Sequence, residues 1–236
     1  MGNWRKKKLE SVVGVTEYPA GGNLAALATI GKQKIYVTTP GYDDIGQVLS
    51  AIGVGYEPFV GTYDCDLFFL NCGTSDGVDS SRLREFVHAG GCLYASDLTS
   101  SIVTDAFPGA FTFGGSGTSG TVQAEVVDSE LRDVIGPRVD VHFDMNSWSV
   151  LNACSGDTLV RASNGTPYSR LPLMVEIDIG HGTVFYTCFH NRAQTSEKDS
   201  ALLKLLVLKQ IGASTRRSLA QVSQSLGINL VALKKP

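Results

Sequence analysis

The sequence contains no uninterrupted apolar run of roughly 18 or more residues, the length that a membrane-spanning helix needs. Its first ten residues are basic, but the apolar stretch of a secretory signal does not follow them. These absences exclude the classes of protein that cross or enter a membrane through such segments. We therefore expect a cytoplasmic protein with no membrane contact.

Metal-binding and nucleotide-binding signatures are also missing. The five cysteines include no Cys-x-x-Cys pair, and the four histidines lie far apart in the sequence, whereas metal sites usually show clustered ligands. Unpaired thiols suit a reducing compartment. The glycine-rich stretch 109–120 lacks the Gly-Lys-Ser/Thr ending of a P-loop, and it is predicted to be a loop that serves as a flexible lid or a hairpin tip. The sequence predicts no metal site and no cofactor.

Charge is unevenly distributed along the chain. The formal net charge is -3, but residues 1–10 and residues 213–236 are both basic, so the part between them is acidic. Two interpretations stay open: the ends are solvated, or they contact a partner or nucleic acid. We expect a protein partner or self-association, and we do not expect nucleic-acid binding.

The 236 residues, 43% of them hydrophobic, are enough for one sizeable core. Short apolar runs at 34–39, 65–72, 92–96 and 183–189 alternate with helical patterns, which predicts an α/β domain with a largely parallel central sheet. We divide the chain into an extension (1–32), this domain (33–212) and a basic tail (213–236). Leu219, Val222 and Leu226 would give the tail an amphipathic helix, docked on a partner or folded back.

Two reactive side chains follow predicted parallel strands. Ser96 ends the run Cys92-Leu93-Tyr94-Ala95-Ser96, and His190 comes just after 183–189. Open α/β sheets bind ligands at the carboxyl ends of their strands. Ser96 and His190 are therefore the candidate catalytic residues.

Around these residues the chain resembles the class I glutamine amidotransferase-like superfamily, especially its ThuA-like, trehalose-utilisation branch and relatives associated with von Willebrand factor A proteins. The resemblance covers about residues 34–212 and implies a flavodoxin-like three-layer sandwich. Ser96 falls on the family's nucleophilic cysteine, residues 188–192 fall on its histidine motif, and residues 70–74 fall on its oxyanion-hole turn. By this resemblance the residues lining the cleft are Asn71, Cys72, Gly73, Thr74, Asp97, Asn191 and Arg192.

The departures from the family pattern bear on activity. Serine stands in place of the cysteine that a glutaminase needs, so we expect no glutaminase activity. Tyr94 and Leu98 replace the glycines that flank the strained turn, and Arg192 replaces the acid that orients the histidine. The scaffold is retained while its reaction centre is altered.

Three function hypotheses follow. The first is a non-catalytic binding or assembly subunit of a bacterial multi-protein system. The second is a hydrolase with Ser96 as nucleophile and His190 as base. The third is a sensor of a small molecule, such as a sugar, bound in the cleft. Each candidate also has a structural interpretation, because Ser96 and Asp97 can cap the following helix and His190 can simply end a strand.

Overall fold

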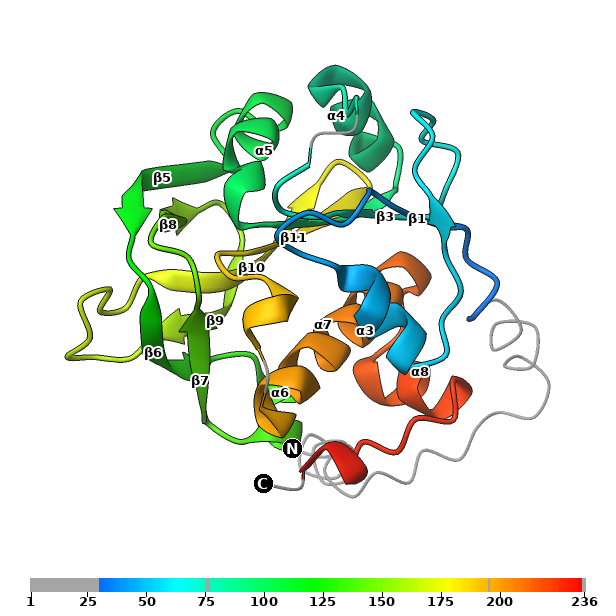
Figure 1. Cartoon of the computed structure of the whole chain (residues 1–236). Helices are drawn as coiled ribbons and strands as arrows, with labels where there is room; N and C mark the ends of the chain where they lie inside the picture. The colour runs from blue at the N-terminus through cyan, green and yellow to red at the C-terminus, as the bar shows by residue number, and fades with distance from the viewer. Residues whose placement is uncertain (1–29, 75–76, 195, 235–236) are drawn as a thin grey trace, which may run out of the picture.

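The computed structural model describes residues 30–74, 77–194 and 196–234 (Figure 1). One nine-stranded sheet has the order β2-β1-β3-β4-β11-β10-β9-β6-β7, and β5 and β8 form a small antiparallel sheet. The strands of the large sheet are β1 (Ile35–Val37), β2 (Glu57–Pro58), β3 (Leu67–Leu70), β4 (Cys92–Ser96), β6 (Gly120–Val126), β7 (Arg138–Phe143), β9 (Asp157–Ala162), β10 (Pro172–Ile179) and β11 (Gly182–Thr187). Those of the small sheet are β5 (Phe111–Gly117) and β8 (Trp148–Cys154).

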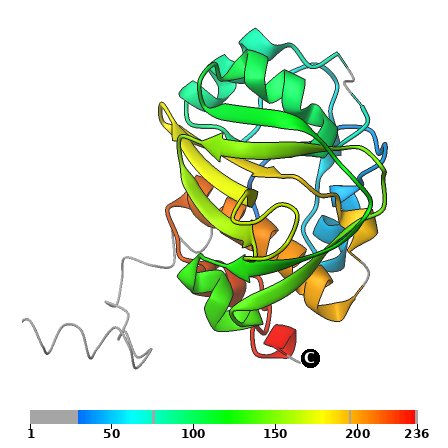
Figure 2. The same cartoon turned by 90° about the vertical axis from the view of Figure 1, so that its left-hand side faces the viewer.

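Helices cover both faces of the parallel core. α4 and α5 lie on one side, and α3, α7 and α8 lie on the other (Figures 1 and 2). The helices are α3 (Ile45–Ala51), α4 (Ser80–His88), α5 (Ser100–Ala106), α6 (Ser129–Ile135), α7 (Glu197–Thr215) and α8 (Leu219–Ser225), with short 3-10 turns η1 (Asp97–Thr99), η2 (Asn191–Ala193) and η3 (Ala232–Lys234). No helix among the described residues is long and apolar enough to cross a membrane.

The parallel core confirms the predicted fold class. β2, β1, β3, β4 and β11 run parallel, and counted alone they have the flavodoxin-like order 2-1-3-4-5. All four residues of β3 and all five of β4 are buried, as expected for strands covered on both faces. The sheet continues beyond β11 as antiparallel strands, so it is mixed overall. The parallel part places the carboxyl ends of β3, β4 and β11 side by side.

The segment after α7 folds back on the chain. Ser218 and Gln221 form a capping box that starts α8, and α8 packs against α7. Leu219 and Val222 are 3% and 0% exposed and belong to the hydrophobic core. The alternative that placed this apolar stripe on a partner is therefore wrong, because the chain's own α7 already covers it.

The glycine-rich stretch 109–120 is not the predicted loop, because residues 111–117 form β5 and pair with β8. The glycines in this strand make room for bulky groups opposite them. A Cβ at Gly114 would lie 2.0 Å from Asn152 Nδ2, and one at Gly117 would lie 2.0 Å from Trp148 Cε2. A composition typical of loops here reflects close packing within a sheet.

Gly117→Ala should therefore destabilise the small sheet. The new methyl group must displace the ring of Trp148, which is buried and stacks on Phe143, and overpacking of this kind costs about 1–3 kcal/mol. Urea unfolding followed by tryptophan fluorescence measures the loss. Gly55→Ala is the matched control, because a Cβ at Gly55 has nothing within 4 Å. Equal stability of the two variants would contradict the packing explanation.

Both outer strands of the large sheet offer few free backbone N–H and C=O groups with which a further strand could pair. β2 is two residues long, and its second residue, Pro58, has no N–H. At the other end, the side-chain amide of Gln194 donates to the carbonyl of His142 in β7 at 2.7 Å and accepts from its N–H at 3.1 Å. The Gln194 side chain thus occupies the outward groups of β7 at that residue.

Candidate functional site

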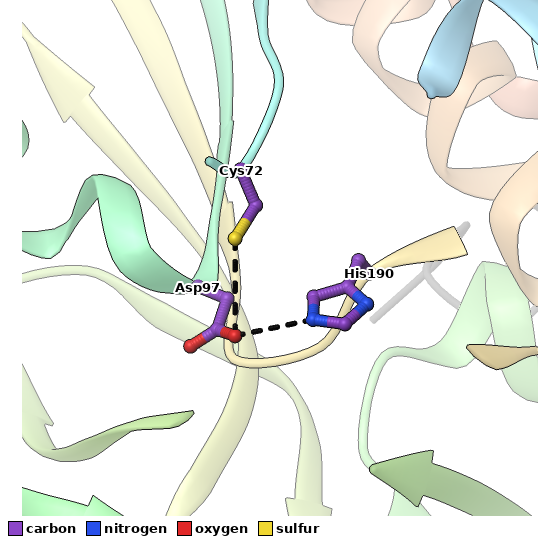
Figure 3. A group of neighbouring side chains, drawn as sticks. All are labelled: Cys72, Asp97 and His190. Carbon is purple, nitrogen blue, oxygen red and sulfur yellow. Dashed lines mark hydrogen bonds and ion pairs between the residues drawn. The ribbon is translucent and has the colours of Figure 1, made fainter. Parts of the chain in front are cut away.

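The candidate residues converge where three parallel strands end. Cys72 lies two residues after β3, Asp97 directly after β4 and His190 three residues after β11. Figure 3 shows the side chains of these three residues pointing toward one another from three different segments. The register aligns these strand ends, since Leu70 lies opposite Ala95 and Thr187 opposite Ser96.

Asp97 occupies the apex of the turn from β4 into η1. Its φ is 41°, in the left-handed region that residues other than glycine seldom adopt. Its backbone carbonyl accepts a hydrogen bond from the Tyr186 hydroxyl, and its Oδ1 accepts one from the Ser149 N–H at 2.7 Å. A strained strand-to-helix turn is where a nucleophile elbow presents its side chain, so here Asp97 holds that position and Ser96 lies one residue before it.

Cys72, Asp97 and His190 form a buried cluster. The Asp97 Oδ2 lies 3.3 Å from His190 Nε2 and 3.9 Å from Cys72 Sγ. The other ring nitrogen of His190, Nδ1, lies 3.4 Å from Asp144 Oδ1. Burial raises the pKa of the Cys72 thiol to about 12. Burial lowers the pKa of His190, but the hydrogen bond to Asp97 and the neighbouring acids outweigh it, so the pKa is raised overall.

Ser96 belongs to a different set of hydrogen bonds. Its Oγ donates to Asp43 Oδ2 at 2.6 Å and accepts from the Cys72 N–H at 3.1 Å. Asp43 is fully buried, in the connection between β1 and α3, and burial raises the pKa of its carboxyl. Its Oδ1 accepts from the N–H groups of Asn191 at 2.7 Å and Asp44 at 3.0 Å. Asp43 therefore links the ends of β4 and β11 to the loop after β1.

The two asparagines of the predicted cleft hold the backbone that precedes α3. Asn71 accepts from the Ile45 N–H at 2.9 Å and donates to the Thr38 carbonyl at 2.8 Å. Asn191 accepts from the Asp44 N–H at 2.7 Å and donates to the Asp44 carbonyl at 2.8 Å. These amides fix the loop over the strand ends.

The remaining predicted residues lie around the same loop. Arg192 donates to the Gly41 carbonyl at 2.8 Å and lies 3.6 Å from Asp44, so it does not replace the acid beside His190. Gly73 has φ of 87°, and a Cβ there would lie 2.5 Å from the Tyr42 ring. Thr74 is half-buried and follows Gly73. The loop after β1 thus packs tightly on the loop after β3.

The residues at the carboxyl ends of β3, β4 and β11 are shielded from solvent in this structure. Ser96, Asp97 and Cys72 are 0% exposed and His190 is 3% exposed. A cavity of about 560 Å³ lies elsewhere, lined by polar groups that include Asp128, Asp157, Glu176, Asp178 and Lys209. Asp178 pairs with residue 183, near the beginning of β11, so this cavity extends toward the amino end of that strand, opposite to the end that carries the cluster.

Sequence reasoning missed Asp43 and Asp144. The sequence pattern places Asp43 at the start of a helix, and Asp144 follows β7 in a region without a clear pattern. The sequence also predicts no metal site, because Cys72, Asp97 and His190 are widely separated along the chain. The fold nevertheless brings their ligand atoms within 4.8 Å of one another. Only the strand order could have indicated this.

Sequence comparison identifies no relative: no protein-family model matches the chain, and no curated protein matches it. Solved structures do match. The chain resembles a cold-adapted β-galactosidase from Rahnella sp. R3 with a TM-score of 0.57 and 15% identity, over 76% of this chain and 31% of that one. The chain thus spans less than a third of the length of that enzyme.

Two further matches cover nearly the whole of the other protein. A protein from Thermoplasma acidophilum assigned as a GMP synthase subunit gives a TM-score of 0.56 and 12% identity, over 78% of this chain and 94% of that one. A ThuA-like protein from Parabacteroides merdae gives 0.53 and 13%, over 78% and 90%. At these identities the likeness shows the fold, which is that of the class I glutamine amidotransferase-like proteins, as the sequence motifs predicted.

Proposed function

We propose that this chain is a non-catalytic amidotransferase-like domain that acts as a binding or assembly subunit of a bacterial multi-protein system. One observation carries the proposal: the candidate nucleophile, Ser96, is bonded to the buried Asp43 and to a backbone amide, away from the candidate base. The retained fold then serves as a scaffold, since fold alone does not impose a reaction.

A serine nucleophile needs a base within about 2.6–3.2 Å to remove its proton. The hydroxyl proton of Ser96 is instead directed at Asp43, while His190 contacts Asp97 and Asp144. The Cys72 N–H, which the family resemblance makes an oxyanion donor, is itself used by Ser96. Nucleophile, base and oxyanion donor are therefore not assembled around a substrate position.

The loops that cover the carboxyl ends of the parallel strands have an outer side that suits an interaction surface. Tyr42 and Leu98 follow the carboxyl ends of β1 and β4, and they are 54% and 38% exposed. Aromatic residues such as tyrosine are enriched where proteins make contact. In the Rahnella β-galactosidase the matched region is 31% of the chain, so a fold of this kind can form one part of a larger protein. Both observations favour an assembly role.

Enzyme assays test this proposal. We expect the purified chain to release no ammonia from glutamine and to hydrolyse no p-nitrophenyl acetate above the rate of the Ser96→Ala variant, because the Ser96 hydroxyl is fully buried and directed at Asp43. Light scattering should give a mass above the 25.2 kDa of one chain, decreasing when Tyr42 and Leu98 are both changed to Ser.

The matched control for the surface is the pair Tyr56→Ser and Val60→Ser, because these residues are also exposed but flank β2. Turnover that disappears in Ser96→Ala would overturn the non-catalytic assignment. A mass of one chain at every concentration would overturn self-association.

A further inference from the structure

We propose that Cys72, Asp97 and His190 form a binding site for a zinc-class divalent ion. The three side chains offer a sulfur, a carboxylate oxygen and an imidazole nitrogen that lie within 4.8 Å of one another (Figure 3). This inference is independent of the proposed function, because an ion held here would tie together the ends of β3, β4 and β11 whether or not a reaction takes place.

The spacing of the ligand atoms suits a tetrahedral ion. Zinc bonds of about 2.0 Å to oxygen or nitrogen and about 2.3 Å to sulfur imply ligand separations of about 3.3 Å for O to N and about 3.5 Å for S to O. The observed separations are 3.3 Å from Asp97 Oδ2 to His190 Nε2 and 3.9 Å from Asp97 Oδ2 to Cys72 Sγ. A small inward rotation of the thiol would bring the sulfur-to-oxygen separation to the expected value.

Groups behind the ligands orient them as in known metal sites. Metal-binding histidines usually present one ring nitrogen to the ion and the other to a carboxylate, and bound carboxylates are themselves hydrogen-bonded. His190 Nδ1 faces Asp144 at 3.4 Å, and Asp97 Oδ1 accepts from the Ser149 N–H. The Nδ1 atom is buried and makes no hydrogen bond. A neutral imidazole with Nε2 on an ion and its Nδ1–H toward Asp144 would resolve that imbalance.

Charge balance also favours a cation. Among the described residues, the fully buried carboxyl groups are those of Asp43 and Asp97, and both lie at this site. Buried charges are costly unless they are paired or bound to a metal. Asp43 accepts hydrogen bonds from Ser96 and two backbone N–H groups, whereas Asp97 and Asp144 both face His190, so these two acids share one basic partner. A divalent ion would supply the missing positive charge.

The chemistry of the donor atoms selects the ion. A cysteine thiolate is a soft ligand that Mg²⁺ and Ca²⁺ do not prefer, whereas a mixed sulfur, imidazole and carboxylate set suits Zn²⁺. Binding would require Cys72 to lose its proton, and a coordinating metal deprotonates a thiol outright. Zn²⁺ is therefore the ion to test first.

Metal content and cobalt substitution test the site. After chelator treatment, zinc loading and dialysis, the wild-type chain should retain zinc at equal molar amounts, and Co²⁺ should give a thiolate charge-transfer band. Cys72→Ser should lose that band and weaken zinc binding at least tenfold, because the loss of even a group that only orients a ligand typically costs 10–100-fold in affinity. Cys65→Ser is the matched control, because Cys65 precedes β3 by as many residues as Cys72 follows it.

The melting temperature gives a second test of zinc binding, which can also be applied to variants that fold poorly. Zinc should raise the melting temperature of the wild type and of His181→Gln, an exposed histidine, and leave that of His190→Gln unchanged. Absence of zinc binding in the wild type, or equal binding by the Cys72 and Cys65 variants, would overturn the site. Repeating the ester assay with zinc separates the two proposals, because metal-dependent turnover would overturn only the non-catalytic function.

Discussion

Removal of residues 216–236 should lower the free energy of unfolding by at least about 4 kcal/mol, because truncating one buried Leu or Ile alone typically costs 2–5 kcal/mol. The deletion takes away Leu219 and Val222, which are almost completely buried. It also uncovers the surface of α7 on which α8 packs. Chemical unfolding of the full chain and of the truncated chain measures the difference.

Single substitutions distinguish the effect of losing buried side chains on stability from the effect of shortening the chain. Leu219→Ala should destabilise the protein by about 2–5 kcal/mol, whereas Val231→Ala, at a residue 67% exposed, should change it by less than about 0.5 kcal/mol. An unchanged melting temperature after the deletion would show that the segment is not part of the core.

Asp43→Ala should be the most damaging substitution at the strand ends. It leaves the Asn191 N–H and the Ser96 hydroxyl without their acceptor inside the protein, whereas the Asp44 N–H keeps its bond to the Asn191 side chain. Unsatisfied buried donors cost about 1–3 kcal/mol each, so we expect a loss of about 3–5 kcal/mol in the free energy of unfolding. Thermal and urea unfolding both report it.

Two companion variants interpret the result. Asp43→Asn keeps a carbonyl oxygen for the backbone donors and should recover most of the loss. Asp64→Ala breaks only an ion pair with Lys34, in which Asp64 is 90% exposed, and should cost at most about 1 kcal/mol. If Asp43→Ala were no worse than Asp64→Ala, Asp43 would not be what holds the loop on the strand ends.

The parallel core could be predicted because its strands are buried on both faces. The predicted strand 92–96 matches β4, and the predicted strand 65–72 contains β3. β5 was missed because its glycines face Asn152 and Trp148, a tertiary reason that composition cannot show. The segment 229–233 resembles a strand in its apolar residues, but it forms turns and η3 instead.

The site was predicted as a location more accurately than as a set of contacts. Ser96 and His190 do lie at neighbouring strand ends, as the rule for open α/β sheets implies. The hydrogen-bond partners of these two side chains depend on the direction that the backbone takes after each strand. That direction is set by the left-handed turn at Asp97 and by the loop that carries Asp43. Neither has a local sequence signal, since an acid at such positions is equally common on a solvated surface.

The outer strands of the large sheet limit how the protein can meet another chain. Pro58 deprives β2 of a donor, and the Gln194 side chain occupies His142 in β7. Neither strand can therefore accept an added strand in continuous register, which protects the native fold from growing into fibres by edge-to-edge addition. Crosslinks formed in any complex should consequently not map to β2 or β7, and peptides that bind by extending a sheet should not bind at either edge of the large sheet.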